Sequence, residues 1–518
     1  MNFIYNGGEL NQKTILGHPS GLYVLFFTEM WERFSYYGMR AILVLFLVSS
    51  FSDGGWGWER SEALALYGLY TGLVYITPIF GGLIADKFLG YRKAVIIGAF
   101  IMTLGHAAMA LEIFNDIYLY LGLVCLIIGN GFFKPNISSI VGQLYKTEGQ
   151  DKDAGYTIFY MGINSGAFLG ILLCGYIGEN IGWHYGFGLA GIFMFFGMLQ
   201  FYYAQNIFGK IGVFNKNSSS NELSELSKDE SKVSSNIIFD RLLVIGIFSF
   251  CVIFFWWAFE QAGGSMTIFA ADYTDRVLEG NRALIFKIFN SIITIVPMII
   301  LSYIIYLLGS NIFLHFKLSS IYLVLSFLII WFIIIWMLQR EFKVPSTEVP
   351  ASWYSILNSF FIIVFAPVIS KIWQSKYNVS GPFKFAFGLI SLAIGFAFLA
   401  YGSINIPLGA KTASVSMVFL ILAYFFHTIG ELCVSPVGLS YVSKLAPKNL
   451  VGLMFGVWFV ANFIANLAAG FTGSFIDPIV EEYGMSVFFL IFTIIPAMAG
   501  IVMLLANKKI VKMMHGVE

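Results

Sequence analysis

The chain has 518 residues, of which 58% are hydrophobic and only 11% are charged, and its formal net charge is +1. Soluble domains carry about 25% charged residues, so a water-soluble fold is excluded and a polytopic membrane protein is predicted. The near-neutral charge gives no indication of a nucleic-acid partner. The four cysteines are far apart and lack metal-ligand spacing, so we interpret them as small core residues.

Apolar runs long enough to cross a membrane recur along the whole chain. The first six are expected near 22–50, 62–84, 93–111, 116–140, 155–177 and 183–204. A polar stretch over 208–237 then has the composition of a flexible linker. Eight more runs follow near 242–271, 283–309, 318–339, 351–374, 382–403, 412–443, 450–474 and 485–506. The predicted fold class is therefore an all-α polytopic membrane protein with about fourteen transmembrane helices.

Lysine and arginine gather in the loops on one side of this predicted bundle, for example at Lys87, Arg92 and Lys93. By the positive-inside rule both termini lie in the cytoplasm, and we expect a multi-pass protein of the cell inner (plasma) membrane. The basic residues that flank the runs at 283–309 and 318–339 are exceptions to this rule. These two runs are almost purely apolar, so we interpret them as lipid-facing additions.

The first apolar run carries ionisable and phenolic side chains at three- and four-residue spacing, which places them on one helix face. They are Glu29, Glu32, Arg33, Tyr36, Tyr37 and Arg40. A single ionised side chain near the middle of a membrane span costs at least about 2.5–3.5 kcal/mol. The charged side chains therefore have to face a water-filled cavity and neutralise one another. A purely structural ion-pair cluster is one interpretation, and a pathway for solute and protons is the other.

Later runs contain further polar side chains that a lipid-facing helix would not hold. Lys134 needs an acidic partner or a wet pocket, unless it snorkels to the interface. Asn164 can accept and donate hydrogen bonds to a solute or simply bond a neighbouring helix. Glu260 is a candidate proton carrier, and it follows the adjacent tryptophans Trp256 and Trp257. His427, four residues before an acid, is interpreted as a packed neutral histidine.

Polar groups differ between the two halves of the chain. The first half supplies the cations Arg33, Arg40 and Lys134, and the second half supplies the acids Glu260 and Glu431. A zwitterion satisfies both sets, so the residues alone favour a short peptide or an amino acid as solute.

Several motifs resemble those of the proton-coupled oligopeptide transporter family, a branch of the major facilitator superfamily. They are E-x-x-E-R-F-x-Y-Y from Glu29, the run Gly129–Asn136 around Lys134, F-Y-x-x-I-N-x-G from Phe159, and E-L-x-x-S-P-x-G-L-S from Glu431. The resemblance implies two six-helix bundles plus two extra helices. The domains are then 1–207 (N-terminal bundle), 208–237 (cytoplasmic linker), 238–272 (seventh core helix), 273–345 (two additional helices) and 346–518 (the remaining five helices).

This resemblance implies a proton-coupled symporter that imports di- and tripeptides by alternating access. Such a protein is not an enzyme, needs no cofactor because the proton gradient drives it, and is expected to be a monomer in the lipid bilayer. Proton coupling is assigned to Glu29, Glu32, Arg33, Lys134 and Glu260. Substrate binding is assigned to Tyr36, Tyr37, Arg40, Tyr75, Lys134, Asn164, Trp256, Trp257, Glu260, Asn358, Glu431, Ser435 and Trp458. The family has one tryptophan near its E-Q pair, and the sequence does not decide whether Trp256 or Trp257 is its equivalent. The alternatives are a transporter of another small solute (an amino acid, a peptide-like drug or nitrate) and a peptide sensor without transport.

Overall fold

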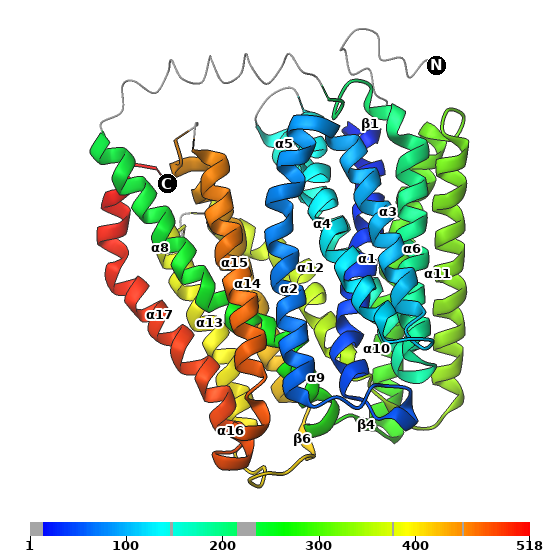
Figure 1. The fold of residues 1–518 in the computed structure, drawn as a ribbon, viewed down its shortest axis with the longest axis vertical. Helices are drawn as coiled ribbons and strands as arrows, with labels where there is room; N and C mark the ends of the chain where they lie inside the picture. The colour runs from blue at the N-terminus through cyan, green and yellow to red at the C-terminus, as the bar shows by residue number, and fades with distance from the viewer. Residues whose placement is uncertain (1–13, 146–148, 215–234, 376–377, 448–449, 518) are drawn as a thin grey trace. The chain divides into compact units, whose positions relative to one another are not determined.

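The structure, a computed structural model, describes residues 14–145, 149–214, 235–375, 378–447 and 450–517. Within this part of the chain, fourteen long helices carry most of the residues (Figure 1). They are α1 (Ser20–Val48), α2 (Arg60–Ile84), α3 (Tyr91–Ala110), α4 (Ile117–Gln143), α5 (Gln150–Asn180), α6 (Trp183–Ala204), α8 (Ser235–Phe259), α10 (Gly280–Ile312), α11 (Lys317–Lys343), α12 (Ile356–Gln374), α13 (Gly381–Gly402), α14 (Val418–Leu445), α15 (Val451–Gly473) and α17 (Met485–Met513).

Short elements join or extend these helices. The helical ones are η1 (Phe51–Asp53), η2 (Ala85–Leu89), η3 (Gln205–Phe208), η5 (Glu260–Gly263), α9 (Ser265–Ile268), η6 (Phe269–Tyr273), η7 (Ala351–Ser355) and α16 (Ile476–Glu482). The strands have two residues each and are β1 (Thr14–Ile15), β2 (His18–Pro19), β3 (Thr274–Asp275), β4 (Val277–Leu278), β5 (Thr347–Glu348) and β6 (Val415–Ser416). They pair as β1 with β2, β3 with β6, and β4 with β5.

The number and character of the long helices confirm the predicted polytopic membrane protein. Among the described residues, thirteen helical segments are long and apolar enough to cross a membrane, with few charged residues in each. Helix α1 is also long enough to span a membrane. It is not among the thirteen because it contains more charged residues, namely Glu29, Glu32, Arg33 and Arg40. The predicted linker over 208–237 lies mostly outside the described residues, because only 208–214 and the start of α8 belong to them.

The described residues form two compact units. The first unit comprises residues 14–42, 77–214 and 276–353, and the second comprises 43–76, 235–275 and 354–517. This division follows packing and does not test the functional domains expected from the sequence, which stay a prediction.

A line of glycines on α5 allows this helix to pack directly on α1 in the first unit. A Cβ atom at Gly166 would lie 2.2 Å from the carbonyl oxygen of Met30, and one at Gly170 would lie 2.2 Å from that of Phe34. Small residues at four-residue spacing let the backbones of membrane helices approach closely. The glycine of the F-Y-x-x-I-N-x-G motif is therefore required by packing, and it fixes α5 against the charged face of α1.

The two additional helices, α10 and α11, belong to the first unit. Helix α11 packs on α6, where Ser319 Oγ donates a 2.8 Å hydrogen bond to the carbonyl oxygen of Gln200. Strands β4 and β5 pair beside the start of α10 and the end of α11, and Arg276 Nη2 lies 2.8 Å from Glu348 Oε1. The outward side of α10 is apolar, with exposed Ile285 and Ile292, which agrees with the expected lipid-facing position.

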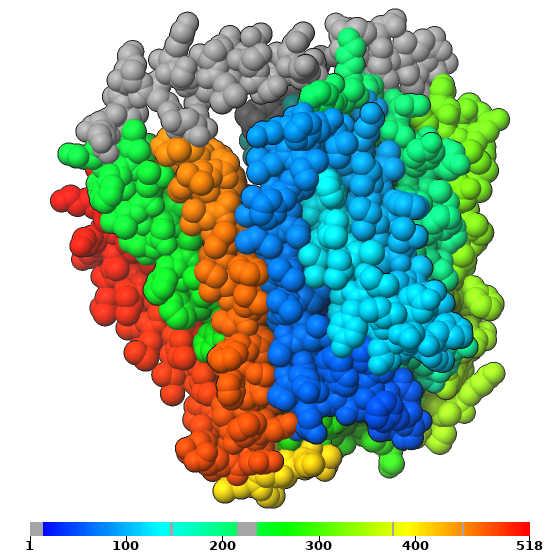
Figure 2. All heavy atoms as spheres, viewed as in Figure 1, coloured from blue at the N-terminus to red at the C-terminus, as the bar shows by residue number. Residues whose placement is uncertain are grey.

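Helices α3 and α4 pack together in the first unit and lie side by side at the surface seen in Figure 2, where their exposed side chains include apolar ones. Phe100, Leu104 and Leu121 are exposed. Because such side chains are stable in hydrocarbon, we interpret this surface as lipid-facing, while the inner face of α4 carries the polar residues described below.

In the second unit, α13 packs against α14 and α17, and α8 packs against α15. Helix α2 meets α15 at Gly68 and Gly470, where a Cβ atom on Gly68 would lie 2.4 Å from the Cα atom of Gly470. Pro367 lies inside α12 and Pro436 inside α14. Helix α12 continues past its proline to Gln374.

Candidate functional site

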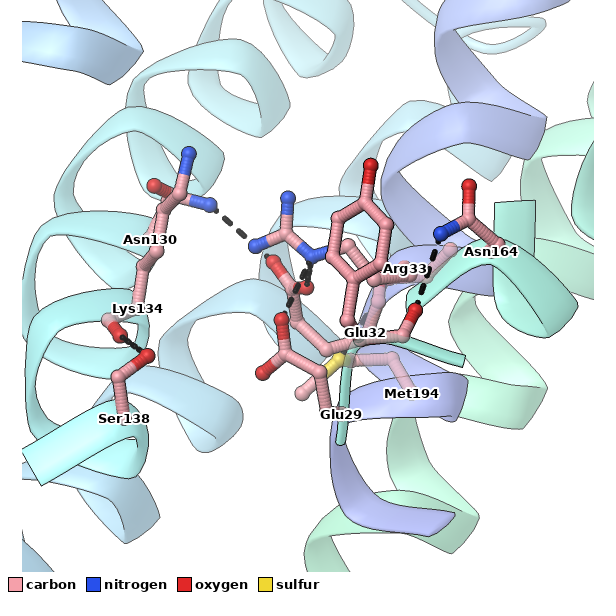
Figure 3. A network of polar contacts seen from close by, with 10 residues as sticks. Glu29, Glu32, Arg33, Asn130, Lys134, Ser138, Asn164 and Met194 are labelled. Carbon is pink, nitrogen blue, oxygen red and sulfur yellow. Dashed lines mark hydrogen bonds and ion pairs between the residues drawn. The ribbon is translucent and has the colours of Figure 1, made fainter. Parts of the chain in front are cut away.

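The ionisable stripe of α1 forms a buried cluster centred on Arg33 (Figure 3). Arg33 Nε lies 2.9 Å from Glu29 Oε1 and 2.5 Å from Glu32 Oε2. The three residues are only 3%, 2% and 0% exposed, respectively. Two acids therefore compete for one guanidinium nitrogen in a region from which water is largely excluded. The ionisation of each acid depends on whether the other is charged.

Helix α4 adds two further groups to this cluster. Asn130 Nδ2 donates a 3.1 Å hydrogen bond to Glu32 Oε1, and Lys134 is close enough to interact electrostatically with both acids. With Arg33 and Lys134 charged, the two cations balance two carboxylates. Glu29 Oε2 and Arg33 Nη2 are buried without a hydrogen-bond partner among the described residues. The cluster therefore keeps spare hydrogen-bonding capacity on both an acid and a base.

The aromatic and basic residues further along α1 stack on one another. The guanidinium carbon of Arg33 lies 5.5 Å from the ring centroid of Tyr36, and that of Arg40 lies 5.9 Å from the ring centroid of Tyr37. The two tyrosine rings meet edge to face at 5.1 Å. Cation–π contacts of this kind help to hold the guanidinium groups of both arginines in place on this face of α1.

Asn164 lies on α5, two residues before the glycine that contacts Met30. Its Nδ2 atom donates a 3.0 Å hydrogen bond to the carbonyl oxygen of Tyr160, one turn earlier in the same helix. This hydrogen bond therefore lies within α5 and does not join Asn164 to a neighbouring helix. A bond within the helix orients the side chain and leaves the amide oxygen as an acceptor.

A second polar group lies in the second unit, where α12 meets α14. Asn358 Nδ2 donates hydrogen bonds to Glu431 Oε2 at 2.8 Å and to Thr428 Oγ1 at 3.2 Å. Glu260, at the start of η5, is buried and interacts electrostatically with Glu431. Two carboxyl groups and one amide are thus brought together, a combination that suits a bound cation or a shared proton.

The structure separates the two adjacent tryptophans of α8. Trp257 is buried, and its Nε1 atom donates a 3.0 Å hydrogen bond to Thr472 Oγ1 of α15. Trp256 is half-buried and meets the rings of Phe255 and Phe259 edge to face. Trp257 therefore joins α8 to α15, and Trp256 is the better candidate for contact with a solute.

The remaining expected residues of the second unit lie on three helices. Ser435 Oγ on α14 is buried without a hydrogen-bond partner among the described residues, and Trp458 on α15 is buried against Gly438. Tyr75 is half-buried on α2. His427 is buried, with its ring centroid 4.4 Å from that of Phe396, so the expected packed histidine is confirmed.

Sequence reasoning singled out the acids of both groups but missed two of their partners, Asn130 and Thr428. Each lies three or four residues from a predicted charged residue, Lys134 and Glu431, and so falls on the same helix face. That spacing was the available signal. Within the described residues, no group of three or more His, Cys, Asp or Glu side chains is arranged to hold a metal ion.

Comparison with known proteins identifies the family. The profile of the POT family matches residues 92–228 and 326–492, more than half of the chain. The chain belongs to the POT family. The family predicted from the motifs is therefore confirmed, and the protein is a membrane transporter and not an enzyme.

Individual POT-family members resemble this chain along nearly its full length. The peptide transporter YePEPT of Yersinia enterocolitica is 32% identical over 87% of this chain and 86% of its own. A di-/tripeptide transporter of Lactococcus lactis subsp. cremoris is 31% identical over 98% of this chain and 99% of its own. A crystal structure of a peptide transporter POT in complex with sulfate is 28% identical, covers 98% of both chains and gives a TM-score of 0.74. The helical fold of the POT family is thereby confirmed.

Proposed function

We propose that this POT-family transporter is a proton-coupled symporter that imports di- and tripeptides by alternating access. The proposal is supported by full-length relatives that are named di-/tripeptide transporters. It is also supported by the chemistry of the two polar groups, one rich in cations and one rich in acids. The proton gradient supplies the energy, and no cofactor takes part.

The observation that carries the proposal is the contact of Glu29 and Glu32 with the same nitrogen of Arg33. One guanidinium neutralises one carboxylate, and the second carboxylate depends on Lys134. A proton on either acid removes this dependence, so Lys134 is then released to bind another anion. Because an unneutralised charge in this buried site is costly, protonation of an acid and release of Lys134 are strongly coupled.

In this proposal the substrate is a zwitterionic peptide, and its two charged ends bind to the two polar groups described above for the first and the second unit. Its carboxylate binds Arg40 and Lys134, and its ammonium group binds Glu431 with the help of Asn358 and Asn164. The rings of Tyr36, Tyr37, Tyr75, Trp256 and Trp458 contact the peptide side chains, whereas Trp257 holds α8 against α15. Glu260, beside Glu431, takes up or releases a proton when the ammonium group of the peptide binds or leaves.

The orientation in the membrane follows the distribution of lysine and arginine among the loops. We place both termini in the cytoplasm of the cell and the protein in the inner (plasma) membrane. One chain supplies every proposed coupling and binding residue, so a monomer is sufficient for the proposed transport.

The test is uptake of labelled dialanine into liposomes that contain the purified protein, with and without an imposed inward pH gradient. The wild type should accumulate dialanine only with the gradient. Glu29→Gln, which keeps the shape of the side chain but cannot titrate, should abolish accumulation and still exchange dialanine in counterflow. Glu62→Gln is the control, because Glu62 is an exposed acid in the first turn of α2.

Two results would overturn the proposal. If Glu29→Gln accumulates dialanine as the wild type does, Glu29 has no role in coupling. If the wild type exchanges free alanine but not dialanine, the substrate is an amino acid. Counterflow of both compounds in the same preparation separates these outcomes.

A further inference from the structure

A cavity of about 400 Å³ lies in the second unit, away from Glu260 and Glu431 along α14. Four helix ends form it: the last turn of α12 with Trp373, the first turn of α13 with Lys384, the last turns of α14 with Tyr441 and Lys444, and the end of α17. Its volume is in the range of small-molecule sites. None of the residues proposed for coupling or peptide binding lines it.

Two cationic side chains line this cavity. Lys384 Nζ lies 4.8 Å from the ring centroid of Trp373, and Lys444 Nζ lies 5.9 Å from that of Tyr441. The two ammonium groups are close enough to repel one another electrostatically. None of the described residues that line the cavity is an aspartate or a glutamate. Positive charge is therefore concentrated here, and an anion would relieve the repulsion.

The first turn of α13 adds further positive potential. This helix has 22 residues and begins at the cavity wall with Ser380, Gly381 and Pro382. The side chain of Ser380 does not cap the helix, because its Oγ atom donates a 2.7 Å hydrogen bond to Asn507 Oδ1. Pro382 has no N–H group, and the Lys384 N–H donates to the carbonyl oxygen of Ser380, so only the other first-turn N–H groups and the helix dipole favour an anion, as at helix N-termini that bind phosphate.

The rest of the wall is amphipathic. Ser440 and Tyr441 are hydroxyl-bearing residues of the wall, and Val437, Val511 and Met514 form an apolar surface. Aromatic rings and lysines beside such a surface are typical of the membrane interface, and basic pockets between transmembrane helices bind anionic lipid headgroups.

We propose that this cavity binds a phosphate-bearing anion, with the headgroup of an anionic phospholipid as the occupant that its position and apolar wall favour. The phosphate lies between Lys384 and Lys444 at the start of α13, and the glycerol and upper acyl chain lie on Val511 and Met514. Bound there, the lipid joins the ends of α12, α13, α14 and α17. A free organic phosphate would use the same charged groups but not the apolar wall. The topology proposed above places these helix ends at the cytoplasmic leaflet. The binding itself does not depend on the proposed transport.

Native mass spectrometry of the purified full-length protein in neutral detergent tests the proposal, with phosphatidylglycerol, phosphatidylcholine and glycerol phosphate as separate probes. The wild type should retain phosphatidylglycerol at least about tenfold more strongly than phosphatidylcholine. The double variant Lys384→Gln/Lys444→Gln should lose this preference. Lys509→Gln, an exposed lysine of α17 that does not line the cavity, should keep it. If glycerol phosphate binds as strongly as the lipid and depends on the same lysines, the anion site stands and the lipid is not its occupant.

A second measurement uses the wild type alone and does not depend on the folding of a variant. Acetylation of lysines by a water-soluble reagent, followed by peptide mass spectrometry, should show Lys384 and Lys444 protected several-fold by phosphatidylglycerol but not by phosphatidylcholine, with Lys509 unchanged. Equal retention of phosphatidylglycerol by the wild type and the double variant would overturn the proposal. So would the absence of protection at both lysines with all three probes.

Discussion

Asn130 Nδ2 on α4 donates a hydrogen bond to Glu32 Oε1 on α1, and Arg33 contacts the other oxygen of the same carboxylate. The acid is therefore held on one side by a cation and on the other by a neutral amide from a different helix. The amide favours the ionised acid without adding charge. Its loss should disturb the acid more gently than the loss of Arg33 would.

Asn130→Ala should lower gradient-driven accumulation of dialanine by about tenfold or more, because a hydrogen bond to a charged group contributes about 1.5–3 kcal/mol. Counterflow, which needs no net proton movement, should be affected much less. Asn136→Ala is the matched control, since Asn136 is equally buried on α4 but donates to the carbonyl oxygen of Phe132 in its own helix. Equal losses in both variants would show that Asn130 acts only through the packing of α4.

Gly166→Ala should destabilise the protein, because the added Cβ atom would lie 2.2 Å from a backbone oxygen and 2.9 Å from Arg33 Cβ. Overpacking of this kind costs about 1–3 kcal/mol and would also shift the charged face of α1. The melting temperature in detergent should fall clearly, and accumulation should fall with it. Gly309→Ala on α10 provides the control, because nothing lies within 4 Å of a Cβ atom there. An unchanged melting temperature for Gly166→Ala would contradict the close packing of α5 on α1.

The sequence predicted the helices and the charged stripe well, because both depend on local spacing. Glu29, Glu32 and Arg33 share a face in any α-helix, and their cost in lipid requires that they neutralise one another. The choice between Trp256 and Trp257 was different. Adjacent residues point about 100° apart on a helix, so only the position of a neighbour such as Thr472 decides which one is buried.

Long-range partners were the part that spacing could not supply. Arg60 lies at the start of α2, where a basic residue at a helix end is unremarkable in sequence. In the structure it contacts Asp272 and Asp477, more than 200 and 400 positions later in the chain. Pro367, which lies inside α12, depends on neighbours in the same way. A proline inside a membrane helix is tolerated where neighbouring groups satisfy the freed carbonyls, and the sequence does not reveal those neighbours.

Arg60→Lys should lower the melting temperature, although the charge is kept. Arg60 uses Nη1 for Asp477 Oδ1 at 2.9 Å and Nη2 for Asp272 Oδ2 at 2.6 Å, and one ammonium group does not span both acids in this fork geometry. Arg282→Lys is the control at an exposed arginine of α10. A cycle with Asp272→Asn and Asp477→Asn should show that each acid couples to Arg60. Simple additivity of the three changes would contradict a shared network.

Asn358→Ala should raise the KM for dialanine by about tenfold in counterflow and leave the maximal rate largely unchanged. Without Asn358, Glu431 Oε2 loses the 2.8 Å hydrogen bond that aims it, so the acid is no longer held ready for an ammonium group. Asn462→Ala is the matched control, because Asn462 is buried on α15 and donates to the carbonyl oxygen of Trp458 in its own helix.

Asn358→Asp sharpens the test, because it places a second carboxyl group against Glu431. Two ionised carboxylates repel, so its defect should be larger at pH 8 than at pH 6, where a shared proton removes the repulsion. A KM for Asn358→Ala equal to that of the wild type, together with a pH-independent defect in Asn358→Asp, would show that this pair is structural and does not meet the substrate.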